Sequence, residues 1–299
     1  MTKYHIPVML TQCLDGLCIV PDGVYVDATY GGGGHSAEIL KQLTTGKLIA
    51  FDQDNDAVKR VQDHPNLIFV DHNFQYIKNF LKFYEIEKVN GILADLGISS
   101  HQIDEGGRGF SFRADAPLDM RMNQEQTVSA KSVINTYQEA ELYRIFKVYG
   151  EVKFARKLAA KIVSRRGQMP IETTGELASM AEEFIPAKQR NKELAQLFQA
   201  IRIEVNGELN SLKILLEKSA EVLKPGGRLV VMSYHSLEDR MVKNFINCGN
   251  IEGDVVSDSF GNVDKPFAAV NRKPIVADEQ EQAENPRSRS AKLRIAERL

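Results

Sequence analysis

VYVDATYGGGGHS, residues 24–36, joins a short apolar run, an aspartate at the end of that run, four glycines and a helix start at His35 and Ser36. This order is typical of the first strand, turn and helix of an α/β domain. Glycine costs backbone entropy, so a fold keeps it where φ is positive or where a ligand lies against the backbone. The amides of a helix start also favour a bound anion. We interpret residues 31–34 as a ligand-binding loop, because a plain turn needs only one or two glycines.

Composition limits the class of protein. The chain has 299 residues, 43% of them hydrophobic and 26% charged, which predicts a globular protein of one domain with an insertion or of two domains. No run approaches the roughly 18 apolar residues of a membrane span, and MTKYHIPVML does not resemble a signal peptide. We therefore expect a cytoplasmic protein with no membrane partner. The three cysteines form no CxxC pair and the six histidines are scattered, so no metal site is predicted. With a net charge of −2, any nucleic-acid partner has to be met by local basic patches.

Further apolar runs continue the pattern of the first. They occupy residues 48–54, 67–71, 91–97 and 228–236. Helical periodicity between the early runs predicts a parallel sheet with helices on both faces. Asp27, Asp52, Asp71 and Asp95 fall at or near the ends of these runs, and His235 follows the last. Since ligands of open α/β sheets bind at that edge, where the strand order reverses, these side chains are candidates for the site.

The strand pattern is interrupted between the fourth run and the fifth for longer than a simple crossover requires. Helical periodicity fills the gap, and one of its helices is predicted to start with a capping box at Thr173 and Glu176. We therefore predict a discontinuous α/β domain made of residues 1–104 and 207–299, with an all-helical domain inserted at residues 105–206.

One predicted helix of the insert, within residues 150–167, carries a line of basic side chains. Lys153, Lys157, Lys161 and Arg165 are spaced i, i+4 beside an apolar line, and we call them the basic stripe. Such a stripe suits a phosphate backbone, although many basic stripes are merely solvated faces. The C-terminal NPRSRSAKLRIAERL is also basic, and is either a second patch or a frayed, charged tail.

Two ligands fit the glycine loop, a dinucleotide of the NAD type and S-adenosylmethionine. Both use an acid about 20 residues beyond the loop, here Asp52, to accept hydrogen bonds from ribose hydroxyls. Asp27 would repel a pyrophosphate but favour the ammonium and sulfonium charges of S-adenosylmethionine. Phe74 is placed to cover an adenine ring. We favour the methyl donor, and keep an NAD-type oxidoreductase and a non-catalytic RNA-binding protein as alternatives.

A series of segments adds a more specific signal. They are HIPV from His5, DATYGGGGHS from Asp27, DLGISSHQID from Asp95, RGFSF from Arg108, PLDMRM from Pro117, FQAIRIEVNGEL from Phe198, SYHSLEDR from Ser233 and NPRSRSAKLR from Asn285. With them the chain resembles the MraW family of ribosomal RNA methyltransferases nearly end to end. The resemblance implies a class I S-adenosylmethionine-dependent methyltransferase (Rossmann-like) sheet with an inserted all-helical domain that recognises the substrate. It also implies N4-methylation of one specific cytidine in the decoding region of 16S rRNA, within the small ribosomal subunit.

The resemblance also implies where the donor binds. Its contacts map onto Gly33, Gly34, His35, Asp52, Phe74, Asp95 and Gln102, to which the charge argument adds Asp27. The cofactor expected there is S-adenosyl-L-methionine, and the oligomeric state is left open, a homodimer included.

The chemistry requires a hydrogen-bond acceptor for the target amine. The N4 lone pair of cytosine is delocalised into the ring, so the enzyme must hold the amine in line with the methyl group and accept its proton. We expect Asp95 to be this acceptor, with Asp119 and His235 as alternatives, His235 being equally well explained as a structural histidine. Arg108 and Arg113 flank the start of the insert and are expected to bind RNA with the basic stripe. The transfer needs no metal, and the target base has to be unstacked.

Overall fold

A computed structural model describes residues 7–99, 102–103, 105–257, 260–261 and 263–299. The motif residues His5, Ile6, Ser100, His101 and Asp104 lie outside these ranges. The chain divides into two compact units. We call Met1–Gly97 with Leu209–Leu299 the sheet unit, and Ile98–Glu208 the helical unit.

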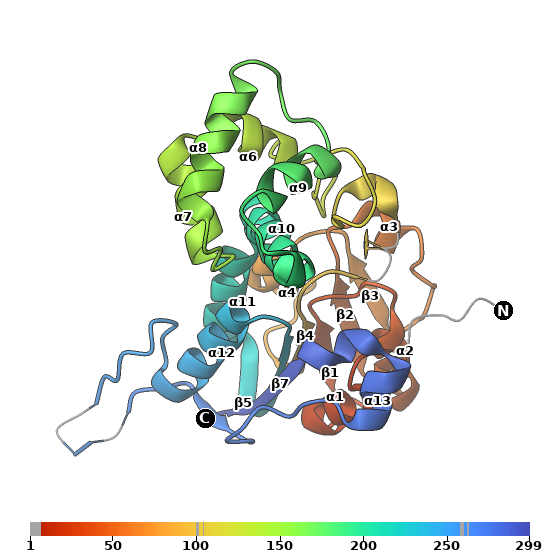
Figure 1. Ribbon diagram of the computed structural model, residues 1–299. Helices are drawn as coiled ribbons and strands as arrows, with labels where there is room; N and C mark the ends of the chain where they lie inside the picture. Colours follow the sequence, from red (N-terminus) through yellow and green to blue (C-terminus); the bar gives the residue numbers. More distant parts are fainter. Residues whose placement is uncertain (1–6, 100–101, 104, 258–259, 262) are drawn as a thin grey trace. The chain divides into compact units, whose positions relative to one another are not determined.

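The described part of the sheet unit contains a seven-stranded sheet in the order β3-β2-β1-β4-β5-β7-β6 (Figure 1). The strands are β1 (Val24–Asp27), β2 (Lys47–Phe51), β3 (Leu67–Val70), β4 (Val89–Asp95), β5 (Leu223–Ser233), β6 (Phe267–Ala269) and β7 (Lys292–Arg298). Strands β1 to β5 pair in parallel, which confirms the predicted α/β fold. The strand order reverses between β1 and β4, so this switch point lies between the ends that carry Asp27 and Asp95.

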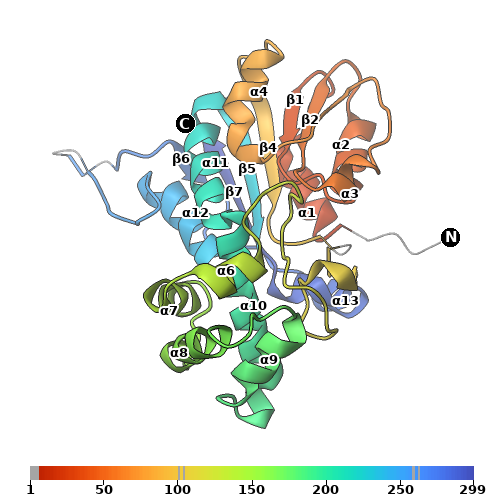
Figure 2. The same ribbon diagram turned by 90° about the horizontal axis from the view of Figure 1, so that it is seen from above.

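Helices cover both faces of the sheet, as the sequence predicts (Figure 2). They are α1 (Leu10–Leu17), α2 (Gly34–Gln42), α3 (Asn55–Val58), α4 (Ile77–Phe83), α11 (Glu208–Val222), α12 (Ser236–Cys248) and α13 (Glu279–Glu284). Side chains alternate across each strand: in β4, Leu93 packs with α1 and α2, whereas Ile92 and Ala94 pack with α4, α11 and α12. This two-sided burial explains why the strands are apolar throughout.

The basic C-terminal segment is a strand of the sheet and not a frayed tail. β7 lies between β5 and β6 and pairs antiparallel with both. Leu293 and Ile295 are buried with α1 and α2, and they alternate with Lys292 and Arg294. Arg294 is itself buried and donates a hydrogen bond to Asp239 over 2.7 Å. The charges of the segment concealed a period-two pattern, so the interpretation as a tail was wrong.

The Lys224–Gly227 stretch lies within β5, directly after its first residue. α11 ends at Val222, and β5 starts at the next residue. The register with β4 shifts within this stretch, where Gly226 has a φ of +77°. A bulge of this kind bends the chain sharply where it enters the sheet.

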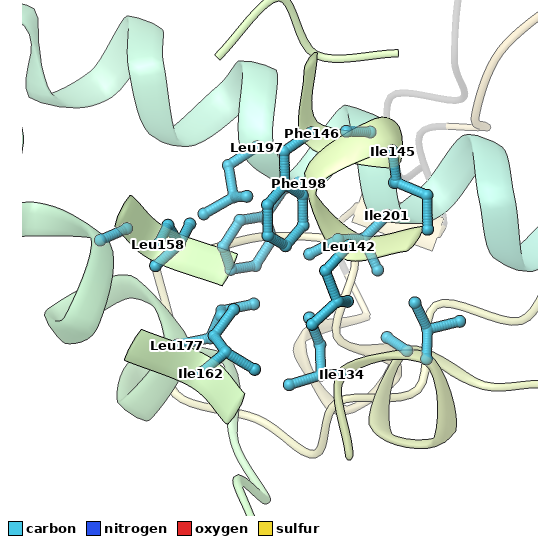
Figure 3. Packing of buried hydrophobic residues seen from close by; sticks show 14 of the residues in the cluster. Ile134, Leu142, Ile145, Phe146, Leu158, Ile162, Leu177, Leu197, Phe198 and Ile201 are labelled. Carbon is cyan, nitrogen blue, oxygen red and sulfur yellow. The ribbon is translucent and has the colours of Figure 1, made fainter. Parts of the chain in front are cut away.

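The helical unit is built from α6 (Ala130–Thr136), α7 (Glu139–Val148), α8 (Ala155–Arg166), α9 (Thr174–Glu182) and α10 (Arg190–Asn206). Leu142, Phe146, Leu158 and Phe198 are among the side chains that meet in its core (Figure 3). The capping box is confirmed, because Thr173 and Glu176 satisfy each other's backbone amides before α9. No described helix of the chain is long and apolar enough to span a membrane.

Candidate active site

The glycine loop follows β1 and leads into α2. Gly31 and Gly33 have positive φ values of 53° and 75°, which other residues adopt only with strain. A Cβ on Gly33 would lie 2.7 Å from the hydroxyl of Tyr30, and one on Gly34 would lie 2.4 Å from Pro7. These three positions therefore need glycine for reasons within the protein itself.

Gly32 is different. Its φ lies outside the positive region, and a Cβ added there would meet no atom within 4 Å. Neither strain nor crowding explains a glycine at this position, whereas a ligand lying against the backbone does. The loop thus offers the open, side-chain-free surface that a bound methyl donor requires, next to the amide groups at the start of α2.

Asp52 ties the end of β2 to this loop. Its Oδ2 accepts a hydrogen bond from the Gly31 amide over 2.7 Å, and its Oδ1 accepts one from the Asp54 amide over 2.9 Å. Burial raises the pKa of Asp52 to about 6, against the opposing effect of the two amide donors. The carboxylate is held in one orientation at the sheet edge, beside the loop.

Asp27, at the end of β1, is buried with 1% of its surface exposed. One oxygen accepts a hydrogen bond from the Thr29 amide over 3.0 Å, and the other accepts one from the Ser36 hydroxyl over 2.7 Å. Burial raises the pKa of Asp27, and the Ser36 bond opposes that rise. Asp27 therefore braces the loop against the start of α2, and its direct contact with a methyl donor stays a prediction.

Asp95 ends β4 beside the switch point. Its Oδ1 accepts a hydrogen bond from the Tyr234 hydroxyl over 2.7 Å, and its Oδ2 lies 3.8 Å from Nδ1 of His35. Its backbone amide donates to the Thr29 hydroxyl over 2.7 Å, which joins β4 to the start of the glycine loop. Burial raises the pKa of Asp95 to about 6, although His35 and Tyr234 both act to lower it. The side chain retains 22% of its exposure, so the carboxylate is accessible at the sheet edge.

His35 faces Asp95 through Nδ1. Its Nε2 lies 3.1 Å from the carbonyl oxygen of Val8. A carbonyl can only accept a hydrogen bond, so Nε2 carries a proton and the ring is held with Nδ1 towards Asp95. The imidazole is 6% exposed, and its orientation is fixed from the start of α2.

His235 caps α12. Its Nδ1 accepts a hydrogen bond from the Glu238 amide over 3.4 Å, and its Nε2 lies 3.2 Å from Oε1 of the same buried glutamate. Glu238 in turn accepts a hydrogen bond from the Tyr234 amide over 2.9 Å. This arrangement favours the structural interpretation of His235 over the catalytic one, which stays a prediction.

Asp119, Gln102 and Phe74 complete the predicted set. Both oxygens of Asp119 accept from Arg121, over 2.8 and 2.7 Å. Burial alone would raise the pKa of Asp119, but the bonds from Arg121 outweigh burial and lower the pKa. Gln102 is buried and accepts from the Ser99 amide over 2.9 Å. Phe74 is partly buried at the start of a 3-10 helix, Phe74–Tyr76, of the sheet unit.

The basic stripe is largely paired. Three members have partners, namely Lys153 with Glu193 at 3.7 Å, Lys161 with Glu183, and Arg165 with the Met169 carbonyl at 3.0 Å. Lys157 is exposed and has no partner among the described residues. Lys153 also precedes α8, which begins at Ala155, so the stripe is shorter on the helix than the spacing predicts.

The two arginines at the start of the helical unit differ in their surroundings. The guanidinium of Arg108 donates to the carbonyl oxygens of Arg121 and Met122, over 2.7 and 3.0 Å, and lies over the Phe110 ring. It therefore holds a loop together. Arg113 is exposed. A role for either side chain in binding RNA stays a prediction.

The sheet unit brings together the glycine loop, His35, Asp52, Asp27 and Asp95, whereas Asp119, Gln102 and the predicted RNA-binding residues belong to the helical unit. Sequence reasoning missed Tyr234. A signal existed, because Tyr234 immediately precedes His235 at the end of β5, and β5 pairs with β4. The strand-end rule that selected His235 also applied to Tyr234.

A parallel sheet with its switch point between β1 and β4, a glycine loop after β1 and an acid after β2 place the chain among the Rossmann-like α/β proteins, which bind a nucleoside-containing cofactor at this edge. The chain belongs to the MraW methylase family, whose model matches residues 2–299. The cofactor of the chain is therefore S-adenosylmethionine, and the NAD-type oxidoreductase alternative is rejected. Binding of the methyl donor at the glycine loop stays a prediction.

Curated relatives match over nearly the whole chain. A protein of Bacteroides fragilis named ribosomal RNA small subunit methyltransferase H is 54% identical, over 99% of this chain and 98% of its own length. A protein of the same name from Amoebophilus asiaticus is 52% identical, over 99% and 96%. A solved rRNA methylase of Streptococcus thermophilus is 13% identical with a TM-score of 0.44, covering 99% of each chain.

Proposed function

We propose that this protein transfers a methyl group from S-adenosylmethionine to the N4 amine of one specific cytidine in the decoding region of 16S rRNA, within the small ribosomal subunit. The names of its relatives support a small-subunit RNA substrate. The position of Asp95 supports the methyl-transfer chemistry. Its accessible carboxylate lies at the switch point, with one oxygen hydrogen-bonded to the Tyr234 hydroxyl and the other facing His35.

The glycine loop and the strand ends supply most of the donor-binding residues in this proposal. The set is Gly33, Gly34, His35, Asp52, Phe74, Asp95, Gln102 and Asp27. S-adenosylmethionine, when bound, supplies an electrophilic methyl group on a sulfonium centre. The loop amides at the start of α2 suit the carboxylate of its methionyl part, and the carboxylate of Asp52 suits its ribose hydroxyls.

Asp95 accepts the hydrogen bond of the target amine. The amine lone pair is delocalised into the cytosine ring, which makes the nitrogen a poor nucleophile. A carboxylate that accepts a hydrogen bond from the N–H group increases the electron density on the nitrogen and so makes it a better nucleophile. With a pKa of about 6, Asp95 is mostly ionised at pH 7 and remains basic enough to take up the proton. Asp119 is a weaker candidate, since both its oxygens are already bonded to Arg121.

The helical unit, predicted from the sequence as residues 105–206, is the substrate-recognition domain in this proposal. Lys157 and Arg113 are the exposed basic side chains best placed to contact phosphates, because the other three members of the basic stripe have acidic or carbonyl partners. The reacting amine is on a base edge, so the enzyme has to act on an unstacked nucleotide.

Transfer of labelled methyl groups tests the proposal directly. Purified protein is incubated with labelled S-adenosylmethionine and naked 16S rRNA, partly assembled small subunits or mature small subunits. The RNA is then digested and its nucleosides are separated. Label in N4-methylcytidine is expected with at least one substrate, and subunits first methylated with unlabelled donor are the control. Absence of transfer to all three substrates would leave only the non-catalytic RNA-binding alternative.

A further inference from the structure

Tyr234 lies against Asp95 in a rigid setting. Its hydroxyl donates to Oδ1 of Asp95 over 2.7 Å, and its backbone amide is held by Glu238 at 2.9 Å. Gly97 also lies against the ring: its φ is +95°, and a Cβ placed there would lie 3.3 Å from Cδ2 of Tyr234. The ring is therefore fixed by the cap of α12 and by the chain that leaves β4.

The two oxygens of Asp95 consequently have different environments. Oδ1 accepts the hydrogen bond of the Tyr234 hydroxyl, whereas Oδ2 is 3.8 Å from Nδ1 of His35, too far for a hydrogen bond. A carboxylate can turn about its last bond, and a hydrogen bond to an ionised group is stronger than one between neutral groups. The Tyr234 bond thus fixes the plane of the Asp95 carboxylate and leaves its other oxygen without this partner.

We propose that Tyr234 is a positioning residue for methyl transfer, which holds Oδ1 of Asp95 so that Oδ2 accepts the hydrogen bond of the target amine. The inference rests on the proposed function. The proposal gives a role to Tyr234, the tyrosine of the SYHSLEDR segment, whose hydroxyl contacts the candidate acceptor Asp95. Tyr234 acts through Asp95 and has no contact with the reacting atoms in this proposal.

Several groups besides Tyr234 set the ionisation of Asp95. His35 on α2 favours the carboxylate, whereas Asp27 on β1 and Glu238 on α12 oppose it, and the buried thiol of Cys13 on α1 is also close enough to interact. Burial and the neighbouring Asp95 raise the pKa of Tyr234 far above its usual value, so the hydroxyl stays a donor at every working pH. Removal of the hydroxyl should therefore raise the pKa of Asp95 further.

The Tyr234→Phe variant tests this role, because it keeps the ring and removes only the hydroxyl. Single-turnover methylation is measured from pH 5 to 9 with saturating S-adenosylmethionine. The rate at pH 7 should fall about tenfold or more, and the rise of rate with pH should move upward by about one pH unit. Donor affinity, measured by calorimetry, should change less than about twofold. Tyr84→Phe, on the far end of α4, is the matched control and should leave both profile and rate unchanged.

A second measurement keeps the test independent of turnover. Carbon NMR of the Asp95 carboxyl group, with and without the Tyr234 hydroxyl, reports its titration in the absence of RNA. An upward shift of the Asp95 titration in Tyr234→Phe supports the proposal even if no RNA substrate is found. The role of Tyr234 is thus tested separately from the proposed function. An unchanged titration together with an unchanged pH profile would show that Tyr234 merely fills space.

Discussion

Oδ2 of Asp52 accepts a hydrogen bond from the backbone amide of Gly31 over 2.7 Å, so the acid after β2 fixes the first glycine of the loop after β1. Gly31 has a positive φ, and the bond holds it in that conformation. The glycine turn and the distant acid, which are separate signals in the sequence, are therefore one structure. A change at Asp52 is expected to disturb both the ribose contact and the loop.

Asp52→Ala should weaken the binding of S-adenosylmethionine by about 1 to 3 kcal/mol, the range for loss of charge-assisted hydrogen bonds. Calorimetric titration with the donor measures the effect. Asp56→Ala is the control, since Asp56 forms an exposed ion pair with Lys59 in α3, and it should bind the donor normally. Equal affinities for the parent and Asp52→Ala would remove Asp52 from the site.

Gly32→Ala and Gly33→Ala should differ in their effect on stability and agree in their effect on donor binding. A Cβ at Gly32 meets nothing and its φ is not positive, so Gly32→Ala should keep the thermal midpoint of the parent. Gly33→Ala forces a side chain into a positive φ beside Tyr30 and should lower that midpoint. Both should weaken donor binding. Normal donor affinity in Gly32→Ala would mean that no ligand lies against this part of the loop.

The sheet was predictable because its strands are apolar on both faces and its acids fall at one edge. The same rules identified the glycine loop, Asp52 and Asp95. β7 was missed because Arg294 and its neighbours give the segment the composition of a tail, and the burial of Arg294 depends on Asp239, 55 residues earlier in the chain. Pairing across such a separation leaves no local signal.

The details of the site depend on packing that no sequence pattern reports. Asp27 was expected beside the charges of the donor, but Ser36 and the Thr29 amide occupy both its oxygens. The basic stripe was visible as spacing, whereas its acidic partners Glu183 and Glu193 come from other parts of the helical unit. Ion pairs of this kind are formed by tertiary packing, so the effective charge of the stripe could not be predicted.

Lys157→Ala should weaken RNA binding and reduce its dependence on salt. Each phosphate contact that is lost lowers the slope of log affinity against log salt by roughly 0.7 to 0.9. Lys153→Ala and Lys161→Ala should have smaller effects, because these lysines are paired with Glu193 and Glu183. Titration of RNA at several salt concentrations measures the slope, with Lys59→Ala in the sheet unit as the control. A slope identical to that of the parent would mark Lys157 as a solvated side chain.

Asp95→Asn should stabilise the protein at neutral and alkaline pH but not in acid. Burial raises the pKa of Asp95 from its ordinary value to about 6, so the folded state binds this proton more tightly than the unfolded state. The resulting stability is present below about pH 4 and is lost as the pH rises through 6. The asparagine side chain does not titrate, so the variant does not lose this stability. Above pH 7 its free energy of unfolding should exceed that of the parent by at most about 3 kcal/mol. Urea unfolding from pH 5 to 8 tests the trend, and an advantage independent of pH would contradict it.

Asp95→Ala should lower the single-turnover methylation rate by about 10² to 10⁴, the usual effect of removing a positioned acid-base group. Asp95→Asn should be milder, because its amide oxygen can still accept one hydrogen bond from the target amine. The family resemblance also places Asp95 among the donor contacts, so both variants are measured with saturating S-adenosylmethionine to separate rate from affinity. A near-normal rate for Asp95→Ala under saturation would limit Asp95 to shaping the pocket. In that case His235 would be tested before Asp119, because Asp119 is already paired with Arg121 at both oxygens.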